Sequence, residues 1–149
     1  MNQLFSAEWM AALKEQWNHN PHIHVPLQKA AFTARIGYGY KGETRARGML
    51  SIVNGKVQDA RAMDDMDVDL DWDLRASQEN WSAWIESGFG LTKLGPAIAT
   101  NSLEFARGNY RQMIRNLSLS QPFLQHFQLM KKIKIAGNSG LATKNKSWF

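Results

Sequence analysis

The chain contains no cysteine among its 149 residues, which excludes disulfides, zinc–thiolate sites and cysteine nucleophiles. No run of apolar residues is long enough to span a bilayer. The first ten residues (MNQLFSAEWM) also lack the basic region and apolar block of a secretory signal. Together these absences predict a cytoplasmic protein.

Sequence signatures of catalysis are missing as well. The chain has no GxSxG elbow, no HExxH, no Walker loop and no GxGxxG followed by a helix. His126 lies between Phe123 and Phe127, and we interpret it as a polar-face or hydrogen-bonded residue rather than a general base. We therefore predict a protein without enzymatic activity, cofactor or metal ion.

Two segments carry potential metal ligands. His19, His22 and His24 lie close together, but Pro21 interrupts them and no acidic residue is near, so an exposed polar loop is predicted. The aspartates of DVDLDWD resemble the start of an EF-hand loop, yet the glycine and glutamate that such a loop requires do not follow. Alternate strand positions that face water explain these aspartates better.

Acidic residues are absent after Glu104, although the whole chain carries a net charge of only +5. The cations of this last region are Arg107, Arg111, Arg115, Lys131, Lys132, Lys134, Lys144 and Lys146. Such polarity favours contact with phosphate groups on lipid headgroups or nucleic acid. The alternative is that these charges only maintain solubility.

Residues 66–88 (MDVDLDWDLRASQENWSAWIESG) are the most informative stretch. Val68, Leu70, Trp72 and Leu74 alternate with charged residues, as in a half-buried strand. Ser77 is a good N-cap for a helix that follows, with Trp81, Trp84, Ile85 and Gly88 on one face. A strand and a helix with adjoining apolar faces predict a shared core.

The remaining pattern predicts a single α+β domain, in agreement with a hydrophobic fraction of 44%. We expect a helix over 6–17 and strands over 29–40 and 45–53. An Asn54-Gly55 hairpin then leads into a third strand and places Arg45 opposite Asp64 on it, and the strand within 66–88 is the fourth. A short helix over 94–100 opened by Gly95-Pro96, a fifth strand over 102–106, a helix over 110–117 and a last helix from Ser120 follow. Residues 1–136 form the domain, and residues 137–149 a flexible basic tail.

This order resembles the sterol-carrier-protein type-two family of lipid-binding domains. The resemblance depends on DVDLDWDLRAS running into QENWSAWIESG, on residues 95–102 followed by LEFARGN, and on the two amphipathic helices after it. It covers about residues 6–134. Before the fifth strand the chain has Asn101-Ser102 where the family commonly has Gly-Lys, and of the Gly-Asp that follows the strand only Gly108 matches.

The resemblance implies a five-stranded, mostly antiparallel sheet with helices on one face, enclosing a hydrophobic cavity for a sterol-like molecule, fatty acid, acyl-CoA or phospholipid. Amphipathic elements rich in Met and Phe suit such a ligand, although the same stripes would also fill a core. The predicted ligand-binding residues are Trp84, Phe89, Leu91, Leu94, Ile98, Met113, Leu117, Phe123, Phe127 and Met130. The predicted headgroup or membrane contacts are Arg111, Arg115, Lys131, Lys132 and Lys134.

The leading hypothesis is therefore non-enzymatic binding and transfer of a lipid, with an anionic membrane or a lipid-metabolism enzyme as a further partner. The first alternative is an accessory or scaffold protein for lipid or isoprenoid-quinone metabolism. The second, less favoured, is nucleic-acid binding through the tail KNKSWF, which mixes cations and aromatics as single-strand binders do.

Overall fold

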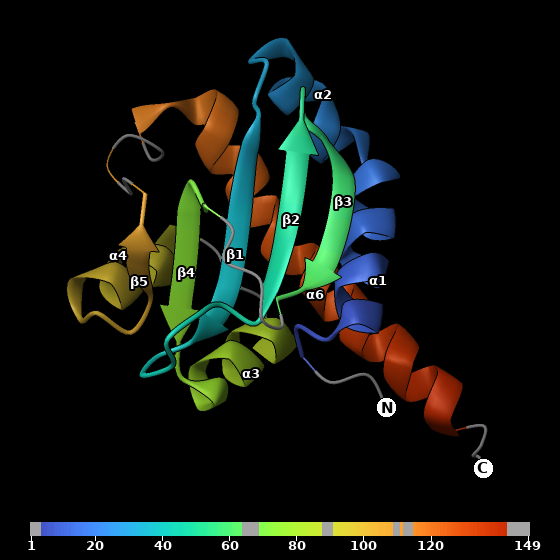
Figure 1. The fold of residues 1–149 in the computed structure, drawn as a ribbon, viewed down its shortest axis with the longest axis vertical. Coiled ribbons are helices and arrows are strands. Elements are labelled where there is room, and N and C mark those ends of the chain that lie inside the picture. Colours follow the sequence, from blue (N-terminus) through green and yellow to red (C-terminus); the bar gives the residue numbers. More distant parts are fainter. Residues whose placement is uncertain (1–3, 64–68, 88–90, 109–110, 112–114, 143–149) are drawn as a thin grey trace.

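A mixed five-stranded sheet forms the centre of the computed structural model, which describes residues 4–63, 69–87, 91–108, 111 and 115–142. The strands are β1 (Ala34–Tyr40), β2 (Gly48–Val53), β3 (Lys56–Ala62), β4 (Trp72–Ala76) and β5 (Glu104–Arg107). Their order is β3-β2-β1-β4-β5, and only the β1–β4 pair is parallel among these strands (Figure 1). The predicted five-stranded, mostly antiparallel sheet is confirmed.

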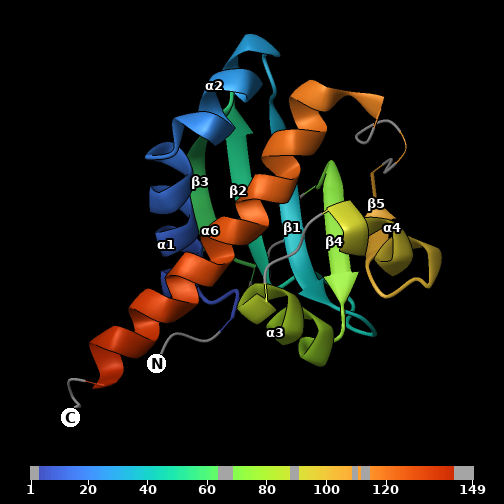
Figure 2. The same ribbon diagram turned by 180° about the vertical axis from the view of Figure 1, so that it is seen from behind.

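The helices lie on one face of this sheet, as predicted. They are α1 (Ala7–Asn18), α2 (Pro21–Lys29), α3 (Gln78–Ser87), α4 (Leu91–Ala99) and α6 (Leu117–Ala142). Figure 2 shows α6 running diagonally across the face, with α1 and α2 on one side of it and α3 near its middle. The α4 helix lies at the β4–β5 edge (Figure 2).

The α1 helix begins where the sequence predicts. Ser6 accepts a hydrogen bond from the Trp9 amide at 3.2 Å, which satisfies a free N–H of the first turn. At the other end, Asn18 bonds both the N–H and the C=O of Val57, and the Trp17 indole donates to the Gly55 carbonyl at 2.8 Å. These bonds attach α1 to the β2–β3 hairpin.

The predicted polar loop around the three histidines is wrong, because the chain starts a new helix there. Asn20 accepts a hydrogen bond from the His22 amide and caps α2, and Pro21 occupies its first turn. Proline is favoured at this position, since its missing N–H would be unpaired in any case. His22 is exposed and His24 half-buried on the resulting helix.

The Asn54-Gly55 hairpin is confirmed. Both residues have positive φ (49° and 86°), as a tight two-residue turn requires. A register shift between Ser51 and Ile52 then moves the pairing of β2 and β3 by one residue. The predicted Arg45–Asp64 pair stays a prediction, because Arg45 precedes β2, which begins at Gly48, and Asp64 lies outside the described residues.

The prediction that the charged residues of β4 face water is wrong for Asp73 and Arg75. Their residues are only 8% and 6% exposed. Arg75 bonds both carboxylate oxygens of Asp73, at 2.6 and 3.0 Å, and donates to the carbonyl of Glu43 at 2.8 Å. The β1–β2 connection therefore covers the second face of the sheet, where a Cβ at Gly39 would lie 3.0 Å from Ala46 Cα.

The C-terminal helices differ from the prediction in their bounds. The α4 helix starts at Leu91 and holds Pro96 inside it, and β5 starts at Glu104. The last helix starts at Leu117 rather than Ser120, and it continues to Ala142, into the segment predicted as a loose tail. Arg111 and Arg115 are helical, and half of the predicted 110–117 helix lies outside the described residues.

Candidate functional site

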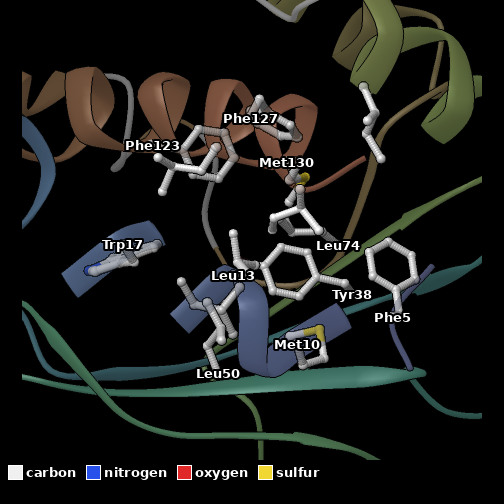
Figure 3. Packing of buried hydrophobic residues seen from close by; sticks show 14 of the residues in the cluster. Phe5, Met10, Leu13, Trp17, Tyr38, Leu50, Leu74, Phe123, Phe127 and Met130 are labelled. Atoms are coloured by element: carbon white, nitrogen blue, oxygen red, sulfur yellow. The ribbon is translucent and has the colours of Figure 1, made fainter. Parts of the chain in front are cut away.

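The space between α6 and the sheet is filled by aromatic rings. Figure 3 shows Phe123, Phe127 and Met130 of α6 facing Tyr38 and Leu74 of the sheet. Phe127 and Met130 are fully buried, and Phe123 is 4% exposed. Their spacing along the helix places all three on one face, because i, i+4 and i+7 positions coincide in a 3.6-residue period. This face of α6 packs toward the sheet, next to α1 and α2.

The structure brings part of the predicted ligand-binding set together. Leu94, Phe123, Phe127 and Met130 are buried members of the main core, and Trp84 and Ile98 are half-buried against it. Leu91 belongs to α4 and Leu117 to α6, but their side chains lie outside the described residues, as do Phe89 and Met113 entirely. The described residues of the set thus belong to one hydrophobic core or pack against it.

The predicted headgroup contacts lie in two places, between β5 and α6 and in the C-terminal half of α6. Arg111 and Arg115 are exposed, Lys132 is exposed and Lys131 is half-buried. The side chain of Lys134 lies outside the described residues, although its backbone is part of α6. The cations of α6 therefore come after its buried residues Phe123, Phe127 and Met130 in the sequence, in the C-terminal half of the helix.

A narrow apolar cleft opens beside this layer. Its lining residues come from α1, α2, the sheet and α6: Trp17, Leu27, Phe32, Ile36, Trp72, Leu119, Phe123 and His126. Its free volume is ≈ 10 Å³, barely room for one water, whereas ligand pockets commonly measure about 300–1,000 Å³. Side chains thus fill the interior in the described part of the chain, and a lipid-sized ligand would have to displace them.

His126 lies inside the apolar layer and not on the polar face of α6, which corrects the interpretation from sequence. It is 1% exposed, and its ring packs on Phe127, Phe123 and Trp17 with centroid distances of 4.6, 5.0 and 5.8 Å. Its Nδ1 donates to the Phe123 carbonyl, which can only accept, so Nε2 carries the lone pair. Burial lowers the pKa of His126 from 6.5 to about 4, against an opposing effect of that hydrogen bond. The imidazole is therefore neutral at pH 7.

The Nε2 atom of His126 is buried and has no hydrogen-bond partner, and the same holds for the hydroxyl of Tyr38. Burial raises the pKa of Tyr38, so its hydroxyl stays protonated. The two rings lie 5.8 Å apart between centroids. The sequence could have indicated His126, because it stands at i+3 from Phe123 on the apolar face of the helix. Tyr38 gave no such signal, since tyrosines on strands usually have a partner for the hydroxyl.

Solved structures with the same architecture decide the fold. Sterol carrier protein 2 superposes with a TM-score of 0.70 and 13% identity, covering 87% of this chain and 98% of that one. A Thermus thermophilus protein described as "possibly sterol carrier protein" gives 0.66 and 14%, with 88% and 90% covered. The chain has the sterol carrier protein 2 fold.

A third structure, described as a "UbiJ-SCP2 Ubiquinone synthesis protein", gives a TM-score of 0.52 and 13% identity, covering 81% of this chain and 90% of that one. No family model and no curated protein matches the sequence. The resemblance predicted from the sequence is thus confirmed at the level of the fold.

On the opposite face of this sterol carrier protein 2 fold, the Asp73–Arg75 pair borders a polar recess of ≈ 240 Å³. Every nitrogen of the Arg75 guanidinium is engaged, because Nη1 donates to the carbonyls of Tyr40 and Glu43 while the other two bond Asp73. A guanidinium used in this way holds the β1–β2 connection in place. We assign this pair a structural role.

The described residues contain no group of metal ligands and no helix that could span a membrane. In residues 4–63, 69–87, 91–108, 111 and 115–142, no three His, Asp or Glu side chains gather as a metal site would require. Within those same ranges no helix combines the length and apolar character needed to cross a bilayer. The layer between α6 and the sheet is consequently the site that we consider for function.

Proposed function

We propose that this protein binds the apolar chain of a lipid between α6 and the sheet and transfers it without catalysing a reaction. The observation that carries the proposal is the aromatic layer of α6, built on a fold shared with sterol carrier protein 2. Phe123, Phe127 and Met130 supply apolar area and adaptable shape for such a chain.

The binding step exchanges contacts within the protein for contacts with the ligand. The cleft beside His126 is too small for a lipid, so α6 moves away from the sheet or the rings rearrange. Each methylene of the ligand gains about 0.8 kcal/mol when it leaves water. Affinity therefore comes from chain length and not from a reaction, and the ten residues predicted from sequence are proposed to line the opened space.

The basic residues extend the proposal to the membrane. Arg111, Arg115 and Lys132 are exposed; Lys132 lies on α6, and the two arginines lie in the segment between β5 and α6. We propose that they contact anionic headgroups while a lipid enters or leaves, with Lys131 and Lys134 beside them. The proposed location is the cytoplasm, where a cysteine-free chain needs no disulfide. The domain proposed from sequence, residues 1–136, carries all of these groups.

Native mass spectrometry of gently purified protein tests the proposal. We expect adducts with lipid masses that organic extraction releases, and displacement of a neutral fluorescent probe by added fatty acid. Phe127→Ala should weaken this displacement at least tenfold, whereas Val53→Ala, at an apolar side chain that is 41% exposed, should leave it unchanged. An adduct-free mass together with no displacement by any lipid would contradict the proposal.

A second candidate function is an accessory role in quinone synthesis. It is favoured by the likeness to the protein described as a "UbiJ-SCP2 Ubiquinone synthesis protein". In this role the lipid site would serve an enzyme bound to the exposed surface. A stable enzyme partner in a pull-down, lost on changing Arg111 and Arg115 to Ala but kept in Phe127→Ala, would favour it over a free carrier.

A further inference from the structure

Two polar atoms in the apolar layer have no partner inside the protein. Tyr38 Oη on β1 and His126 Nε2 on α6 are both buried, and their residues are 0% and 1% exposed. Most buried polar side-chain atoms in folded proteins are hydrogen-bonded, because an unpaired one loses its bonds to water without compensation. Two such atoms on facing elements, with ring centroids 5.8 Å apart, are therefore groups that a buried water or the polar end of a ligand can satisfy.

The chemistry of the two atoms differs, and the difference is informative. His126 Nδ1 donates to the Phe123 carbonyl, so Nε2 can only accept. The Tyr38 hydroxyl can donate or accept. A ligand that satisfies His126 must therefore offer an O–H or N–H, and a hydroxyl group can at the same time accept from Tyr38.

We propose that Tyr38 and His126 recognise the polar end of a neutral amphiphile that carries a hydroxyl group, such as a sterol, a phenol or a long-chain alcohol. This inference depends on the proposed lipid-binding function and specifies its ligand class. The hydroxyl donates to His126 Nε2 and its oxygen accepts from Tyr38 Oη, while the hydrocarbon part occupies the opened apolar layer.

Other lipid ends fit these two atoms less well. A carboxylate brings a charge into a layer of Trp17, Phe123 and Phe127 rings, where an unpaired ion is costly. A quinone, ester or ether oxygen can accept from Tyr38 but leaves His126 Nε2 unpaired. The pair therefore discriminates by hydrogen-bond donation, and apolar length contributes to all ligands alike.

Two isomers test the proposal: 1-tridecanol and 1-methoxydodecane have the same atoms, but only the alcohol donates a hydrogen bond. Each displaces N-phenyl-1-naphthylamine from full-length protein that has been stripped of lipid on a hydrophobic resin. We expect wild type to bind the alcohol at least about fivefold more tightly than the ether. His126→Phe removes the acceptor that only the alcohol can use, so the preference should disappear while the ether binds as before. Tyr38→Phe removes a donor that either oxygen can use, so both isomers should bind more weakly and the preference should remain. The control, Phe127→Leu, should weaken both isomers equally.

The outcomes separate this inference from the proposed function. Equal binding of both isomers by wild type overturns the hydroxyl recognition and leaves lipid binding intact. Binding of neither isomer removes both. Thermal unfolding of the ligand-free variants adds a readout that does not need a ligand, because removing an unpaired hydroxyl costs no hydrogen bond. A Tyr38→Phe melting temperature equal to or above that of wild type supports the assignment, and a fall of about 5 °C or more overturns it.

Discussion

His126 makes the stability of the fold depend on pH in a way that a single substitution removes. The imidazole is neutral in the folded protein because burial lowers its pKa from 6.5 to about 4. In the unfolded chain it regains a pKa near 6.5, so between these two values the unfolded state binds more protons. Stability is therefore fully present above pH 6.5 and is lost as the pH falls toward 4.

The magnitude follows from the two pKa values. At pH 4.5 the unfolded histidine is almost fully protonated and the folded one is mostly neutral. Linkage then predicts a loss of about 2 kcal/mol between pH 7 and pH 4.5 from this group alone. His126→Phe keeps an aromatic ring at the site, which is surrounded by the rings of Trp17, Tyr38, Phe123 and Phe127, and it abolishes this contribution.

Urea unfolding followed by tryptophan fluorescence measures the effect in lipid-free protein. Both proteins also lose stability at low pH through groups common to them, such as Glu43, whose pKa is lowered chiefly by its hydrogen bond from Arg47. Comparing the two proteins cancels this shared part. We expect wild type to lose about 2 kcal/mol more than His126→Phe between pH 7 and pH 4.5. Equal losses in the two proteins would refute the buried, neutral state of His126.

Three further predictions concern stability at pH 7, measured by the same unfolding assay. Arg75→Met should lower the free energy of unfolding by about 3–5 kcal/mol, because it leaves the Asp73 carboxylate buried without its partner. Adding Asp73→Asn should restore part of this loss. A cost below about 1 kcal/mol would show that the pair is solvated. Gly55→Ala should cost about 3 kcal/mol of stability, since its Cβ would lie 2.5 Å from a backbone nitrogen of α2. The control Gly42→Ala, with a similar φ of 88° and open space around it, should cost about 1 kcal/mol. Equal costs would disprove the close approach at Gly55. Trp81→Phe should cost about 1–3 kcal/mol, because it removes a 2.8 Å hydrogen bond to a β1 carbonyl, and a neutral result would mean that water replaces the indole.

Elements that depend on neighbouring residues could be predicted from the sequence. Ser6 and Ser77 cap α1 and α3 through amides three residues later, at 3.2 and 3.0 Å. The Asn54-Gly55 turn likewise depends on two adjacent residues that tolerate positive φ. The Asn20-Pro21 pair is also a signal from adjacent residues, but asparagine and proline can either end a helix or begin one. Here they cap α2 and start its first turn.

The burial of Asp73 and Arg75 could not be predicted in this way. Alternation along β4 indicates two faces but not what covers each of them. The cover comes from the connection between β1 and β2, whose carbonyl of Glu43 accepts from Arg75 across 32 positions of sequence. Only the β1–β4 pairing, which is parallel and joins strands far apart in the chain, brings the two together.

In the candidate site, too, local features could be predicted from the sequence and long-range contacts could not. Spacing along α6 predicts that Phe123, Phe127 and Met130 share a face, and the structure confirms it. The rings that complete the layer, Trp17 and Tyr38, come from α1 and β1, and no pattern in either segment connects them with α6. Tertiary packing therefore determines which polar atoms face the ligand.

The filled interior makes lipid binding and folding compete for the same surface. A chain of about twelve methylenes gains about 10 kcal/mol on leaving water. Exposing three large apolar side chains of α6 costs about 1.5–3 kcal/mol each, which takes up much of that gain. Net affinity therefore depends on whether Phe123, Phe127 and Met130 repack on the ligand as α6 shifts, and this exchange is nearly the same for any apolar chain. Discrimination between lipids must come from groups whose partners are missing until the ligand arrives, which in the described layer are Tyr38 Oη and His126 Nε2.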